Sequence, residues 1–141
     1  MAIDFVPGMD ISASGLKAER VRMKVASNNM ANANSTADKD GNVYQRRQVI
    51  LSPEFKDHVG SALDQFDGVK VTEVTKADRP PEKEYAPDHP KANEEGMVKK
   101  ANISPLEEML DMMTAMRAYE SNLTSLKQSR EMAQRVIDLL K

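Results

Sequence analysis

The last part of the chain constrains the fold more than any other segment, because its apolar side chains follow one helical repeat. From Met109 to Leu140 they recur in alternating steps of three and four residues, and only Arg130 breaks the series. Such steps average ~3.5 residues, which is the repeat of a coiled coil. The predicted seam residues of this segment are Met109, Met112, Met116, Tyr119, Leu123, Leu126, Ala133, Ile137 and Leu140.

We expect this segment to be one uninterrupted helix, because residues 106–141 contain neither glycine nor proline. At ~1.5 Å per residue the helix would be roughly 55 Å long. Its start carries a helix cap, with Ser104 as the N-cap, Pro105 as the first helical residue and Glu107 three residues after the cap. A helix of this length extends beyond any globule that 141 residues can form, so it needs partners along its length.

Residues 1–34 predict a second helix with a weaker form of the same repeat. Ser12 and Glu19 interrupt its apolar stripe, and further apolar side chains lie on another face. One partner helix cannot cover both faces, so further neighbours are expected. The predicted seam residues of this helix are Met9, Leu16, Met23 and Met30.

Asparagines gather near the end of the first helix and recur in the last one. Four of them lie in SNNMANANS and another lies in RAYESN. A buried amide loses its partner when two helices slip, so it penalises wrong registers at some cost in stability. We therefore expect one set of polar residues to fix the register and to contact neighbouring chains: Asn28, Asn29, Asn32, Arg117, Glu120 and Asn122.

The middle of the chain, residues 35–104, is rich in loops and separates the helical parts 1–34 and 105–141. Strand-forming residues occur at 43–51 (VYQRRQVIL) and at 68–75 (GVKVTEVT). We expect residues 52–66 to be an irregular excursion with one or two helical turns at most. The proline-rich stretch DRPPEKEYAPDHP predicts an extended, polyproline-like chain without strand pairing.

Composition excludes several classes of function. A formal net charge of −2 gives no reason to expect nucleic acid as a partner. No apolar run approaches the ~20 residues that span a bilayer, so no direct membrane insertion is expected. The N-terminal stretch MAIDFVPGMD lacks the features of a cleaved signal peptide.

Catalytic and metal-binding motifs are also missing. The chain has no cysteine, and its two histidines, His58 and His89, lie far apart in the sequence. No nucleophile elbow or glycine-rich phosphate loop occurs. Glu107, Glu108 and Asp111 suit the positive end of a helix dipole and need no substrate to explain them. We therefore predict no catalytic residue, no metal site and no cofactor.

Several motifs in this order resemble a known family. ISASGLKAERVRM followed by SNNMANANS resembles the N-terminal motif of the bacterial flagellar axial proteins, which include rod, hook and hook-associated subunits. EEMLDMMTAMRAYESNLTSLK resembles their C-terminal signature. The stretch YAPDHPKANEEGMV and the chain length narrow the resemblance to the proximal rod subunits of that family. The resemblance covers residues 9–34 and 85–132.

The resemblance implies a structural subunit and a mainly α fold with a small β part. The terminal helices of such subunits form an antiparallel coiled coil, and a loop-rich lobe that contains strands is inserted between them. The subunits polymerise into a helical tube, the rod of the flagellar basal body, which crosses the periplasm and transmits motor torque to the hook. The implied partners are other copies of the chain, other rod subunits and the flagellar type III export apparatus, which needs no cleaved signal peptide.

Antiparallel pairing of the two helices also predicts a register. Met30 should lie near Met112 or Met116, and Met9 near Ile137 or Leu140, within one or two helical turns. An alternative function remains open at this point, namely a soluble helical adaptor that binds partner helices through its methionines. A rod subunit should be poorly ordered at both ends as a purified monomer, whereas an adaptor should be a stable helical dimer. Circular dichroism with size exclusion would distinguish them.

Overall fold

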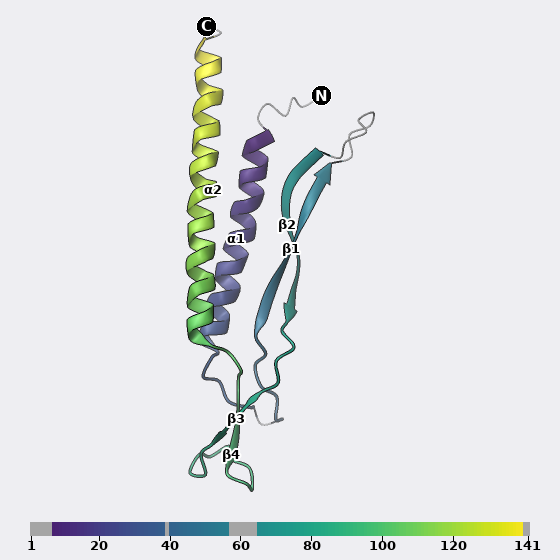
Figure 1. The fold of residues 1–141 in the computed structure, drawn as a ribbon, viewed down its shortest axis with the longest axis vertical. Helices are drawn as coiled ribbons and strands as arrows, with labels where there is room; N and C mark the ends of the chain where they lie inside the picture. The colour runs from purple at the N-terminus through teal and green to yellow at the C-terminus, as the bar shows by residue number, and fades with distance from the viewer. Residues whose placement is uncertain (1–6, 39, 57–64, 140–141) are drawn as a thin grey trace.

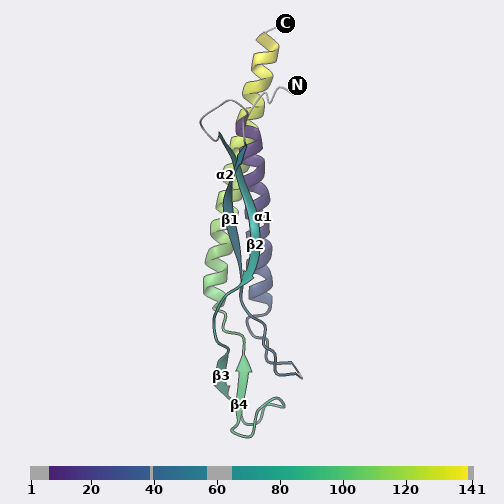
Figure 2. The same ribbon diagram turned by 90° about the vertical axis from the view of Figure 1, so that its right-hand side faces the viewer.

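Two long antiparallel helices dominate the computed structural model, which describes residues 7–38, 40–56 and 65–139 (Figure 1). Helix α1 spans Pro7–Ala31 and helix α2 spans Pro105–Leu139. They lie side by side in both views, and α2 continues beyond the point where α1 begins (Figure 2). The molecule is therefore elongated along the axes of these helices.

Four strands between the helices form two antiparallel pairs. Strand β1 (Arg47–Lys56) pairs with β2 (Gln65–Lys76), and β3 (Glu82–Tyr85) pairs with β4 (Met97–Lys100). The β1–β2 ribbon packs along α1 on the side away from α2, so α1 forms the middle of three layers (Figure 1). The predicted fold class, mainly α with a small β part between the terminal helices, is confirmed.

The ribbon meets α1 most closely at Gly68. The hydroxyl of Ser14 donates to Ile11 O on its own helix (2.7 Å) and accepts from Val69 N on β2 (3.0 Å). Gly68 has a φ of +136°, and a Cβ added there would lie 2.2 Å from Ser14 Oγ. Both the backbone conformation and the close approach therefore favour glycine at this position.

Gly68→Ala is expected to lower the free energy of unfolding by about 1–3 kcal/mol, because the new methyl group collides with Ser14 and the backbone is strained. Urea unfolding followed by circular dichroism measures the loss. Gly41→Ala is the matched control, since Gly41 also has a positive φ (+81°) but nothing within 4 Å of an added Cβ. If the two variants lose equal stability, the contact with Ser14 does not hold the ribbon.

The buried apolar side chains are few and small. Among the described residues they are Ala18, Ala26, Ala33, Val98, Ala101, Ile103 and Ala115. Alanines bury little apolar area, so the single chain gains little hydrophobic stabilisation. One local cluster of these residues, packed against Val43 and Tyr44, joins the end of α1 to the segment before α2.

Two predictions for the middle of the chain are wrong. Residues 52–56 and 65–66 continue the strands of the β1–β2 ribbon, whereas an irregular excursion was expected there; residues 57–64 lie outside the described part of the chain. The proline-rich stretch also contains a paired strand, β3. Its prolines stand before and after that strand, at 80, 81, 87 and 90, so none of them removes a donor from the β3–β4 ladder.

The predicted helix register is wrong at the Met9 end. A Cβ added to Gly8 would lie 3.7 Å from Ser129 Oγ, so the residue after it lies opposite a part of α2 more than two turns before Ile137. The prediction paired apolar residues of the two helices with each other. It assumed that the start of the first helix lies beside the end of the last helix. In the structure the closest contacts are polar, and α2 is ten residues longer than α1 (35 against 25).

Candidate functional site

The most polar part of the helix contact lies near the end of α1. Asn29 and Glu108 are the largest fully buried side chains among the described residues. Asn29 Nδ2 donates to Glu108 Oε2 at 2.9 Å, so an amide and a carboxylate link the two helices directly. Buried groups of this kind persist only when their remaining atoms also have partners.

The segment that leads into β1 supplies those partners. Asn29 Nδ2 also donates to Arg47 O (2.7 Å), and Asn29 Oδ1 accepts from Arg47 N (2.9 Å) and from the Tyr44 hydroxyl (3.1 Å). Arg46 Nε donates to Glu108 Oε1 at 2.6 Å and neutralises the buried carboxylate. Because one amide binds both backbone groups of Arg47, it determines how the chain turns from α1 toward β1.

Small and polar residues at heptad spacing form the inner surface of the helix pair. A Cβ added to Gly15 would lie 2.7 Å from Asn122 Nδ2, so the helices approach closely at this glycine. Ala115, which belongs to the same series on α2, is fully buried. The facing pairs that define the register are Gly8 with Ser129, Gly15 with Asn122, and Asn29 with Glu108.

The predicted seam residues differ in how much of each side chain the single chain covers. Half-buried positions are Met9, Leu16, Met23 and Met30 on α1, and Met112, Tyr119, Leu123, Leu126 and Ala133 on α2. By contrast, Met109 (47%), Met116 (49%) and Ile137 (44%) are exposed. Leu140 lies outside the described residues. That all of these residues belong to one seam within the subunit therefore stays a prediction.

The predicted polar residues also lie in different places. Asn29 and Asn122 point into the helix contact, whereas Asn28, Arg117 and Glu120 are exposed. The side chain of Asn32 is half-buried and donates to the carbonyl of Asn28 (2.8 Å) on its own helix.

At the start of α2, Glu107 N donates to Ser104 Oγ at 3.4 Å. The Glu107 carboxylate reaches outward to Arg79 (2.9 Å).

Sequence reasoning missed several residues of the buried network. It assigned Glu108 to the helix dipole, and it gave no role to Arg46 or Tyr44. An ion pair between Arg22 and Asp111, which also joins the helices, was missed as well. The signal was present as a second heptad series on α2, one residue before the methionine stripe: Glu108, Ala115, Asn122 and Ser129.

The outward side of α2 carries exposed apolar side chains in two groups, separated by exposed polar side chains at residues 117–131. We call these two groups the outer face: Leu106, Met109, Leu110, Met113 and Met116, then Met132, Val136, Ile137 and Leu139. Among the described elements α2 contacts only α1, so no other described element covers this outer face. An extended exposed apolar patch on a folded chain marks a site of interaction with another protein or a membrane.

Two other kinds of site are not found in the described part of the chain. No three histidine, cysteine, aspartate or glutamate side chains there stand close enough to hold a metal ion. Neither α1 nor α2 carries an apolar stretch sufficient to span a bilayer. The outer face of α2 and the buried network are therefore the features that the fold presents most clearly.

Comparison with known proteins places both ends of the chain in related families. Residues 9–37 match the family model described as flagella basal body rod protein. Residues 94–139 match the model described as flagellar basal body rod FlgEFG protein C-terminal. These two segments contain most of α1 and α2, the helices that pair in the structure.

Curated relatives match nearly the whole chain. FlgC of Agrobacterium fabrum (strain C58) is 40% identical, with 93% of this chain and 91% of the relative covered. FlgC of Bacillus subtilis (strain 168) is 35% identical over 93% of this chain and 95% of the relative. FlgC of Aquifex aeolicus (strain VF5) is 35% identical over 99% of both chains. All three are described as flagellar basal-body rod proteins.

Paired terminal helices, an inserted β part and matches at both ends define a structural subunit of the bacterial flagellar rod. Within that class, the chain belongs to the FlgC family of flagellar basal-body rod proteins. Its place is the flagellar basal body, and it assembles with other components of the rod.

Proposed function

We propose that the outer face of α2 is buried against neighbouring subunits when the chain polymerises into the proximal rod. The resulting helical tube would cross the periplasm and transmit motor torque to the hook. Long helices suit this role because they pack lengthwise against several neighbours, and their interdigitated side chains resist sliding. The role is mechanical, and it requires no catalytic group, metal or cofactor.

The exposed apolar surface of α2 is the observation that carries this proposal. Among the described residues the chain buries mainly alanines, while many of its larger apolar side chains are exposed, most of them on the outer face of α2. A chain that exposes such a surface gains its main hydrophobic stabilisation only on association. Residues 131–139 of α2 continue past the Gly8–Ser129 contact and the start of α1, and neighbouring subunits would cover them.

The same geometry suggests a separate role for each part of the chain. We propose that residues 1–34 and 105–141 act together as the helical assembly domain. Residues 35–104 form the inserted lobe that faces adjacent subunits. Export would use the flagellar type III apparatus, and two properties support this route: the chain has no cysteine to form a disulfide, and its small core is easily unfolded for passage.

Met116→Asp is expected to abolish incorporation into basal bodies while the chain itself remains folded. Met116 is 49% exposed in the single chain, so a carboxylate there stays hydrated until a neighbour covers it. Covering it would bury an unpaired charge, which costs several kcal/mol. Immunoblots of purified basal bodies measure incorporation, and circular dichroism of the purified chain measures folding.

Ser121→Asp provides the matched control on the same helix, because Ser121 is exposed within the polar stretch that separates the two apolar groups of the outer face. It introduces the same charge and should assemble and support swimming normally. Normal swimming with Met116→Asp would contradict the proposed role of the outer face.

A further inference from the structure

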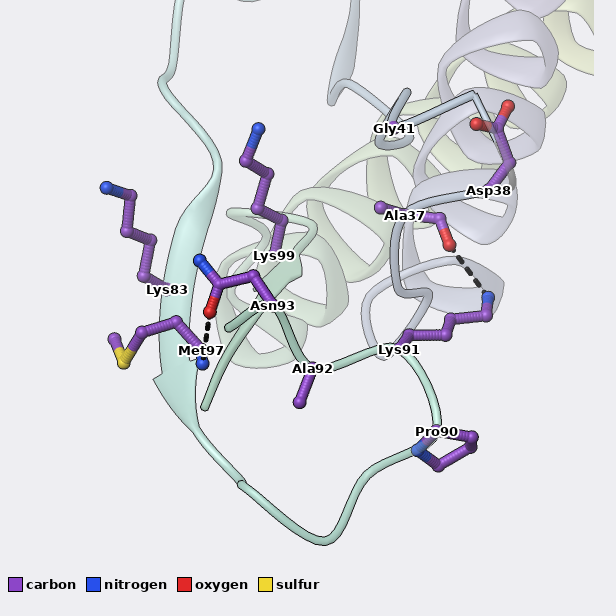
Figure 3. A pocket seen from close by; sticks show the side chains of 10 residues that line it. All are labelled: Ala37, Asp38, Gly41, Lys83, Pro90, Lys91, Ala92, Asn93, Met97 and Lys99. Atoms are coloured by element: carbon purple, nitrogen blue, oxygen red, sulfur yellow. Dashed lines mark hydrogen bonds between the residues drawn. The ribbon is translucent and has the colours of Figure 1, made fainter. Parts of the chain in front are cut away.

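A basic pocket lies at the end of the molecule that is formed by the β3–β4 pair. Its volume is about 510 Å³, and it lies between this strand pair, residues 90–93 and the side formed by Ala37, Asp38 and Gly41 (Figure 3). Three lysines line it, Lys83, Lys91 and Lys99, against one carboxylate, that of Asp38. The lining therefore carries an excess of positive charge on a chain whose net charge is −2.

Two of the lysines stand directly opposite each other. Lys83 on β3 is the cross-strand partner of Lys99 on β4, and both side chains line the pocket. Like charges in this position destabilise a strand pair. Neither lysine has an ion pair within the described residues, whereas Lys100, the next residue along β4, reaches Glu84 at 3.7 Å. The strand pair thus places two lysines opposite each other, and no ion pair of either one is found within the described residues.

The other charged groups of the pocket already have partners. Lys91 Nζ donates to Thr36 Oγ1 (3.0 Å) and to Ala37 O (2.7 Å), so it closes one wall. Asp38 Oδ1 accepts from the backbone N–H groups of residues 40 and 42 (both 2.9 Å), and the bond from Asn42 lowers the pKa of Asp38. Figure 3 shows the Asp38 carboxylate on the opposite side of the pocket from Lys83 and Lys99.

Most of the remaining lining is apolar, because Ala37, Pro90, Ala92 and Met97 contribute to it, and the amide of Asn93 is the polar addition. A small inorganic anion could satisfy the two ammonium groups but would leave these apolar walls and most of the volume to water. A peptide segment with an acidic side chain next to an apolar one matches both parts of the lining. A protein segment is therefore the occupant that this pocket fits best.

We propose that this pocket receives an acidic segment of a neighbouring rod subunit, whose carboxylate lies between Lys83 and Lys99. The inference rests on the proposed polymerisation and assigns a specific contact to the inserted lobe. The like-charged pair then has a function: it weakens the strand pair in the single chain and is neutralised only in the assembled rod. A residue pair that costs stability in isolation is expected where the partner supplies the missing charge.

Lys83→Glu separates assembly from folding. The new carboxylate would pair with Lys99 across the strands, so the midpoint of thermal unfolding of the purified chain should not fall. Incorporation into basal bodies should nevertheless fall at least tenfold, because the introduced charge repels the acidic segment and occupies Lys99. The double variant Lys83→Arg with Lys99→Arg retains both charges and should assemble as the unchanged chain does.

A zero-length carbodiimide cross-linker identifies the contact in basal bodies that contain the unchanged chain. It joins an ammonium group to a carboxylate that touches it, and mass spectrometry then locates the linked residues. We expect links from Lys83 or Lys99 to an aspartate or glutamate of another subunit. Lys70 serves as the internal control, because its ammonium lies 4.0 Å from Glu54 within the same chain.

Normal incorporation of Lys83→Glu, or cross-links from Lys83 and Lys99 only within their own chain or to a non-protein carboxylate, would overturn the inference. Its failure is distinguishable from failure of the proposed function. If Met116→Asp still prevents assembly, the outer face of α2 keeps its role and only the acidic partner is rejected.

Discussion

Glu108→Ala is expected to lower the free energy of unfolding by about 3–5 kcal/mol, the loss typical of a buried ion pair that loses one partner. Removal of this carboxylate leaves the Arg46 guanidinium, which is only 16% exposed, without its anion. It also removes an acceptor from the buried amide of Asn29. Small domains are stable by only ~5–15 kcal/mol, so the helix pair should lose much of its order. Urea unfolding of the purified chain, followed by circular dichroism, measures the change.

Glu107→Ala is the matched control, since it removes the preceding residue of the same type from the same helical turn. Its ion pair with Arg79 is exposed on both sides, and surface pairs of this kind contribute ~0–1 kcal/mol. Glu108→Gln should lie between the two variants, because the amide keeps one oxygen for Asn29 but no charge for Arg46. Equal losses for Glu107→Ala and Glu108→Ala would show that the buried network does not hold the helices together.

The helices were predictable because their signals are local. A 3–4 repeat that only Arg130 breaks, together with the Ser104 cap, predicts α2 without knowledge of what surrounds it. The inner surface of the helix pair was harder to predict from the sequence, because its residues are small or polar. The apolar stripe, which lies one residue further along α2, predicted a different seam. Glycine weakens a helix on propensity alone, whereas at Gly15 its missing side chain brings the helix backbone close to Asn122.

The β part was harder to predict because strand pairing depends on residues far apart in the sequence. Strand β3 is four residues long and pairs with β4 across a turn, and nothing in the sequence EKEY alone indicates a strand. The network of Asn29 combines residues 29, 44, 46, 47 and 108, which no single periodic pattern connects. Contacts that depend on the tertiary fold of the middle segment could therefore not be predicted from the sequence.

These observations describe a helix pair with two different surfaces. The inner surface contains few large apolar groups and obtains its specificity from polar contacts in one register. The outer face of α2 holds the large apolar side chains that the single chain leaves exposed. A subunit of this kind can fold into one arrangement with modest stability and gain most of its hydrophobic stabilisation in the polymer.

Ala115→Asp tests this division of surfaces and should have the second large effect on stability. Ala115 is fully buried on the inner surface of α2, so the new carboxylate would be buried there, and Arg22, which the register places opposite it on α1, is already paired with Glu19 and Asp111. We expect the free energy of unfolding to fall by at least ~3 kcal/mol, with loss of helicity in the purified chain. Circular dichroism and urea unfolding measure both quantities.

The comparison with Met116→Asp makes the test specific, because the two variants place the same charge at adjacent residues of one helix. Ala115→Asp should impair folding and consequently assembly, whereas Met116→Asp should impair assembly alone. If Ala115→Asp left the purified chain as stable as Met116→Asp does, the inner surface would not be the one that joins α1 to α2. If Ala115→Asp unfolds the purified chain and Met116→Asp does not, adjacent residues of α2 have separate roles. One residue then contributes to folding of the subunit, and the next contributes to assembly of the rod.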